Sequence, residues 1–137
     1  MLFRSAGQSG NTGCQALAVT LRGLTLGELA PGSERRLVAK EAGLGFLNGA
    51  GVGLFAATGM YITATSQHAA HPVLLAIVVF IAMVGACVAS GISGAMVPLT
   101  LKRLGFDPAT ASSIFLTTAT DVVSMGMLLG LATLLVR

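Results

Sequence analysis

Charged residues are scarce in this chain. Only 9% of its 137 residues are Asp, Glu, Lys or Arg, and none of these lies between residues 42 and 101. Soluble domains carry about 25% charged residues, so the composition excludes an ordinary soluble domain. The uncharged run is about twice as long as one membrane-spanning helix and therefore predicts two spans joined by a turn. We expect an integral membrane protein that contacts lipid.

Other absences narrow the function. Trp is missing and Tyr61 is the only Tyr, so an aromatic belt at the membrane surface is thin. Cys14 and Cys87 lie in different apolar segments without metal-binding spacing, and a buried free thiol is expected at each rather than a disulfide. No catalytic triad appears and no carboxylate pair lies within one span, so an enzyme is not expected. The net charge of +3 comes from basic residues at span ends and does not indicate nucleic-acid binding.

The hydrophobic pattern predicts an all-α, polytopic transmembrane bundle that forms a single domain over residues 1–137. Four spans are expected, at about residues 7–26, 42–63, 72–101 and 108–136. The span at residues 7–26 has the weakest hydrophobic signal, because it is rich in glycine and polar residues. The fourth begins at Asp107-Pro108, with Asp as N-cap and Pro in the first helical position. Glycines at 45, 49 and 53 predict a close contact between helices.

Charges in the loops indicate the orientation. The loops at residues 28–41 and 102–103 contain Lys and Arg, whereas the loop at residues 65–71 contains neither. By the positive-inside rule the two basic loops are cytoplasmic and the C-terminus lies outside. We also expect residues 1–6 to be non-native or disordered, because Leu-Phe-Arg-Ser is encoded by one frame of a common sequencing-adapter end. The hypothesis is a truncated reading frame.

Asp121 is the only charge between Asp107 and Arg137, and it lies about 20 Å along the fourth span, near mid-bilayer. An Asp at such a depth costs roughly 2.5 to 3.5 kcal/mol on insertion scales, so it is expected on an ion or proton path. Ser113 and Thr117 precede it at four-residue spacing and share its helix face. The alternative is an Asp121 satisfied by its own Thr hydroxyls and a neighbour such as Arg22.

The string from Gly10 to Gln15, GNTGCQ, is unusual for a span. We expect irregular backbone here, with exposed carbonyls and the Asn11 amide as hard oxygen ligands for a cation. A glycine-rich packing segment is the alternative. These oxygens and one carboxylate suit Mg²⁺ but do not select it over Ca²⁺, Mn²⁺ or H⁺. Cys14 and Gly13 are expected to line the path, as is Ser113.

Three motifs occur in order along the chain: GNTGCQ at residues 10–15, DPA at 107–109 and TTATDV at 117–122. With them, the chain from Gly10 onward resembles the membrane domain of the MgtE-type magnesium channels and transporters. The resemblance implies a homodimer with five membrane helices per subunit and a pore at the dimer interface, lined by the helices that match spans one and four. Hydrated Mg²⁺ would be held by Asp121, with backbone oxygens of Gly10 and Thr117 and the side chain of Asn11.

The chain also departs from that family. The family's first membrane helix and its cytoplasmic regulatory region, an N-terminal domain plus paired CBS domains, have no counterpart, which fits the truncation hypothesis. Cys14 stands where relatives commonly have polar residues, and Ser124 where a Gly often follows the aspartate.

We therefore expect a multi-pass protein of the cell inner membrane that conducts Mg²⁺ into the cytoplasm, with Mg²⁺ as transported ion rather than cofactor. Two alternatives remain. One is a proton- or sodium-coupled carrier in which Asp121 titrates. The other is a non-transporting scaffold subunit in which Asp121 is a buried helix contact.

Overall fold

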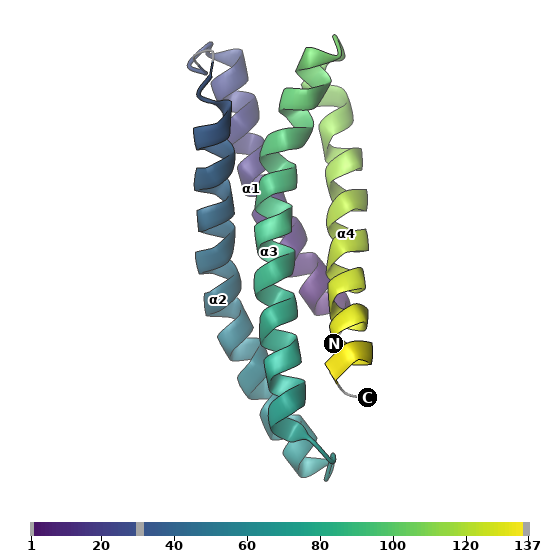
Figure 1. Cartoon of the computed structure of the whole chain (residues 1–137). Coiled ribbons are helices and arrows are strands. Elements are labelled where there is room, and N and C mark those ends of the chain that lie inside the picture. The colour runs from purple at the N-terminus through teal and green to yellow at the C-terminus, as the bar shows by residue number, and fades with distance from the viewer. Residues whose placement is uncertain (1, 30–31, 136–137) are drawn as a thin grey trace.

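The computed structural model describes residues 2–29 and 32–135, which form four long helices (Figure 1). They are α1 (Leu2–Thr25), α2 (Glu34–Ser66), α3 (Pro72–Arg103) and α4 (Pro108–Leu135). Helix α3 packs against α2 on one side and α4 on the other, and α1 crosses the bundle diagonally against α3 and α4. The expected all-α membrane bundle is confirmed.

Three of the helices are long and apolar enough to cross a membrane: α2, α3 and residues Ser112–Leu134 of α4. Their outward faces carry large apolar side chains, as lipid contact requires; on α2 these include Leu47, Leu54, Phe55 and Ile62. Helix α1 is not among the three because glycines and polar side chains interrupt its apolar residues. A multi-pass membrane protein follows, and a fourth crossing by α1 stays a prediction.

Two expected boundaries differ from the helices observed. Helix α2 begins at Glu34, eight residues before the predicted span, because a helix continues past the membrane surface where its side chains turn charged. Helix α1 begins at Leu2 and runs without a break to Thr25. The expectation of irregular backbone over residues 10–15 was therefore wrong, since glycines are tolerated inside a helix that packs closely on its neighbours.

Local chemistry explains where the helices start and stop. Asp107 accepts a hydrogen bond from the Ala109 amide at 3.0 Å and caps α4, as its sequence predicts. Two residues after the end of α3, Gly105 adopts the left-handed conformation, with φ of 79°, and stops the helix from continuing. Two residues after the end of α2, His68 is left-handed in the same way, with φ of 53°. The next amide, of Ala69, donates to the Ala64 carbonyl at 2.9 Å and closes the helix end.

Small residues bring the helices together. Gly45, Gly49 and Gly53 are buried against α3, which confirms the predicted close contact. A β-carbon on Gly49 would lie 2.8 Å from the Cα of Val84, so the backbones nearly touch. Helix α1 docks on α3 similarly, and the Ser90 hydroxyl of α3 donates to the Ser9 carbonyl of α1. This packing fixes α1 beside α4, where the candidate site lies.

Candidate functional site

Helix α4 has a buried face and a polar exposed stripe side by side. Its buried residues are Ser112, Leu116, Thr120 and Ser124, at four-residue intervals. One position further along, Ser113, Thr117 and Asp121 are exposed at the same interval. The predicted polar stripe thus exists on the surface of the single chain. Because α4 is a membrane helix, this stripe needs water or protein against it rather than lipid.

The hydroxyls around Asp121 are engaged elsewhere. The Thr117 hydroxyl donates to the Ser113 carbonyl, the Thr120 hydroxyl to the Thr117 carbonyl at 3.0 Å, and the Ser124 hydroxyl to the Asp121 carbonyl at 3.2 Å. Among the side chains that the structure describes, none donates a hydrogen bond to the Asp121 carboxylate or pairs with it. The alternative in which Thr hydroxyls or Arg22 satisfy this acid therefore finds no support in these contacts, and the carboxylate is open to a cation.

Helix α1 divides into two faces. Its buried face packs on α3 and α4 and consists of Leu17 together with small or hydroxyl-bearing residues at positions 9, 12, 13, 16 and 20. The opposite face exposes Asn11, Cys14, Gln15 and Ala18. Cys14 is therefore exposed, which corrects the expectation of a buried thiol, whereas Cys87 is buried as expected. Both cysteines are free.

The predicted glycines play different roles. Gly13 is on the buried face, where an added β-carbon would lie 3.0 Å from Cδ1 of Leu116 in α4. Nothing lies within 4 Å of the corresponding position on Gly10, so one side of its backbone is open. A helical carbonyl keeps a second lone pair after its helix bond, so Gly10 can offer an oxygen without unwinding. The second lone pair of the Thr117 carbonyl accepts from the Thr120 hydroxyl, which has to rotate away before this oxygen can bind an ion.

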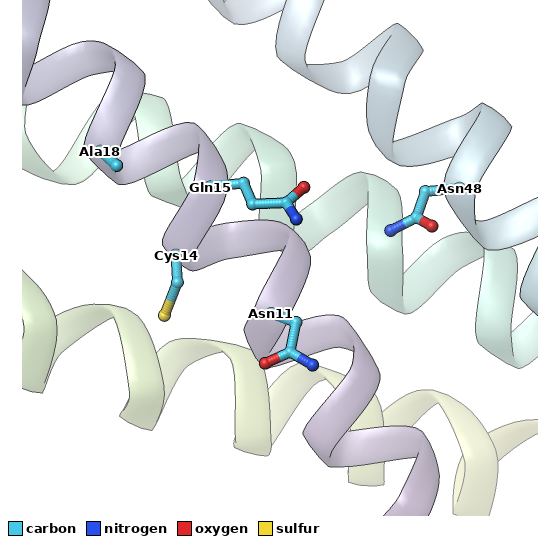
Figure 2. Close-up of a pocket in the computed structure, with 5 residues that line it drawn as sticks. All are labelled: Asn11, Cys14, Gln15, Ala18 and Asn48. Atoms are coloured by element: carbon cyan, nitrogen blue, oxygen red, sulfur yellow. The ribbon is translucent and has the colours of Figure 1, made fainter.

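A pocket of about 460 Å³ opens on the exposed face of α1 (Figure 2). Four residues of α1 line it together with one of α2: Asn11, Cys14, Gln15, Ala18 and Asn48. Gln15 and Asn48 are not among the site residues predicted from the sequence. Asn48 could have been singled out, because it is the one carboxamide within the predicted second span. The spacing of residues does not predict which helix its side chain contacts.

The ligands available are oxygens. No group of three His, Cys, Asp or Glu that could hold a metal occurs within the described residues. The exposed polar side chains of α1 and α4 instead include the carboxamides of Asn11 and Gln15, the hydroxyls of Ser113 and Thr117, and the carboxylate of Asp121. Such a set suits a hard cation that keeps part of its water shell.

Comparison with known proteins places the chain in a family. The family model described as "MgtE: Divalent cation transporter" matches residues 5–131. The chain is 34% identical to the magnesium transporter MgtE of Enterococcus faecalis over 131 residues, which is 96% of this chain. It has the same identity and coverage with the magnesium transporter MgtE of Thermus thermophilus, and 33% identity over 141 residues with that of Bacillus subtilis, covering 93% of this chain.

The matched region is one part of those relatives. The chain spans 28% of the length of the Enterococcus and Thermus proteins and 27% of the Bacillus protein. The similarity extends over α1 to α4 and includes every candidate site residue named above.

Proposed function

Because the chain belongs to the MgtE family of divalent cation transporters, we propose that it conducts Mg²⁺ through the cell inner membrane into the cytoplasm. Three relatives that match more than nine tenths of this chain are magnesium transporters by name. The ion is cargo rather than a resident cofactor. Mg²⁺ binds its water tightly, so a path for it needs oxygens that accept hydrogen bonds from water and one charge that attracts the cation.

The path runs between α1 and α4. Asp121 supplies the charge, and the carbonyls of Gly10 and Thr117 with the Asn11 side chain supply neutral oxygens. Cys14 and Ser113 line the path beside them, and Gly13 seats α1 against α4. The observation that carries the proposal is the Asp121 carboxylate, which is exposed and unpaired among the described side chains on a helix apolar enough to cross a membrane.

The path is completed by a second copy of the chain. The exposed faces of α1 and α4 carry carboxamides, hydroxyls and a carboxylate, which cost free energy against lipid. In a homodimer joined through these faces, the two sets of polar groups enclose water between them. The outer apolar faces of α2 and α3 remain toward the bilayer.

Flux into liposomes tests the proposal. The protein is the full chain reconstituted into liposomes, and a Mg²⁺-sensitive dye inside them reports entry. Flux that follows an imposed membrane potential without a proton or sodium gradient supports the proposal. Flux that requires one of those gradients would favour a coupled carrier, and correctly inserted protein without flux would favour a scaffold subunit.

A further inference from the structure

Helix α1 is joined to α2 by a hydrogen bond between side chains from distant parts of the chain. The Asn48 amide nitrogen of α2 donates to the Thr12 hydroxyl of α1 at 2.7 Å. Thr12 is buried and Asn48 is half-buried, so the bond lies at the inner edge of the pocket. Since the nitrogen of the carboxamide is engaged by Thr12, its oxygen is the end left to accept from a ligand.

The pocket lining is polar and uncharged. Three carboxamides line it, from Asn11, Gln15 and Asn48, together with the Cys14 thiol and the Ala18 methyl group. Figure 2 shows the Gln15 and Asn48 amides pointing toward the space between their helices. Carboxamide oxygens accept hydrogen bonds from the water ligands of a cation and carry no charge that would strip those ligands away.

The surroundings require this pocket to be wet. Asn48 lies within the run of residues 42–101 that contains no charge, on a helix long enough to span a membrane. Polar groups at membrane depth are stable where they line a water-filled cavity or contact protein. A volume of about 460 Å³ holds several water molecules, each of which occupies roughly 30 Å³ in the liquid. A hydrated divalent ion therefore fits.

Along the proposed path into the cytoplasm, the pocket comes after Asp121. Helices α1 and α4 run antiparallel (Figure 1). They meet where Gly13 faces Leu116. Gln15 is two residues beyond that contact on α1, and Asp121 is five residues beyond it on α4, in the opposite direction along the bundle. Seven helical residues at 1.5 Å each put Gln15 roughly 10 Å from the level of Asp121, and Asn11, which the two sites share, lies between them. The pocket is on the side of the basic, cytoplasmic loops.

We propose that this pocket binds a hydrated divalent cation through hydrogen bonds from its water ligands to the carboxamide oxygens of Asn11, Gln15 and Asn48. The inference rests on the proposed function and adds to it a second, neutral ion site. A cation leaving Asp121 toward the cytoplasm keeps its water here. Asn48 also holds α1 in place through Thr12, so one residue both orients the pocket and binds in it.

Cys14 provides a reporter inside the pocket, because it is exposed while Cys87 is buried. A water-soluble maleimide reacts with the full chain in detergent, and mass spectrometry follows the Cys14 peptide with MgCl₂ or with NaCl of equal ionic strength. An ion in the pocket slows labelling by one plus the ratio of Mg²⁺ concentration to Kd, about tenfold at ten times the Kd.

Variants separate this pocket from Asp121. We expect Mg²⁺ protection of Cys14 to disappear in Asn48→Leu and in Gln15→Leu, which remove carboxamides from different helices. It should persist in Asp121→Asn. It should also persist in Thr58→Val, a control in α2 that removes a hydroxyl donating within the same helix to the Leu54 carbonyl. Circular dichroism and gel filtration select the variants that fold, and two independent carboxamide variants keep the test decisive.

Several results would overturn the inference. Equal labelling with and without Mg²⁺, or protection that survives both leucine substitutions, would show that the carboxamides bind no ion. Loss of protection in Asp121→Asn would place the protecting ion at Asp121. A Cys14 that does not react even without Mg²⁺ would show that the pocket is closed to water. None of these results requires that flux be absent, so failure of this inference is distinct from failure of the proposed transport.

Discussion

Gly45 of α2 lies so close to Cys87 of α3 that a β-carbon on Gly45 would approach the Cys87 carbonyl oxygen to 2.5 Å. The two helices meet backbone to backbone at this point. Asn48 is three residues further along α2, so the contact also fixes the height at which its carboxamide reaches α1. Packing between α2 and α3 thereby positions a residue of the candidate ion path.

Gly45→Ala should destabilise the protein. The added methyl group meets a carbonyl that belongs to a rigid helix, and overpacking of this kind costs about 1–3 kcal/mol. The free energy of unfolding in mixed detergent micelles, titrated with SDS, measures the effect.

Gly51→Ala is the matched control in the same helix, since nothing lies within 4 Å of its β-carbon position. It should leave stability unchanged or raise it by up to about 1 kcal/mol. Equal effects at both positions would contradict the close contact.

Glu41→Met should stabilise the protein. Glu41 is only 5% exposed, and its Oε1 has no hydrogen-bond partner among the described residues. A buried unsatisfied polar atom costs about 1–3 kcal/mol, and methionine fills a similar volume without one. The same SDS titration measures the gain in the free energy of unfolding.

Glu34→Met is the control in the same helix. It removes an acid that pairs with the exposed Arg103, and it should change stability little. A loss of stability in Glu41→Met would mean that the carboxylate has a partner, such as a cation.

Modification of Cys14 should block transport. Its side chain is exposed on the face of α1 proposed to line the path. A thiosulfonate reagent with a positively charged group forms a mixed disulfide with this thiol and releases sulfinate, and the bulky cationic adduct obstructs and repels the ion. Magnesium uptake before and after the reagent gives the result, with a large loss expected. Cys14→Ser should transport normally and be insensitive, because Cys87 is buried. Full uptake by quantitatively modified protein would show that this face of α1 does not line the path.

The fold could be predicted largely from local signals. The Asp107-Pro108 pair caps α4 through a side-chain hydrogen bond that its own sequence specifies, and the apolar runs predict the membrane helices. The start of α2 could not be placed in this way. Charged residues mark where the membrane ends, whereas the helix continues into water to Glu34.

The site was harder to predict because it depends on contacts between helices. The spacing of Ser113, Thr117 and Asp121 correctly predicts a shared face of α4. The bond between Asn48 and Thr12 joins residues 36 positions apart, and no periodicity within either helix indicates it. The exposure of Cys14 likewise depends on which side of α1 packs against α3, which the tertiary structure alone determines.

Magnesium uptake by a magnesium-auxotrophic bacterium tests the role of Asp121 most directly. The cells express the chain as the parent, Asp121→Asn or Asp107→Asn. The account predicts that the parent and Asp107→Asn restore growth and uptake, because asparagine also caps a helix. Asp121→Asn should insert normally and restore neither, since it keeps the shape of the side chain and removes its charge. Uptake at the parent's rate by Asp121→Asn would contradict the proposed ion site.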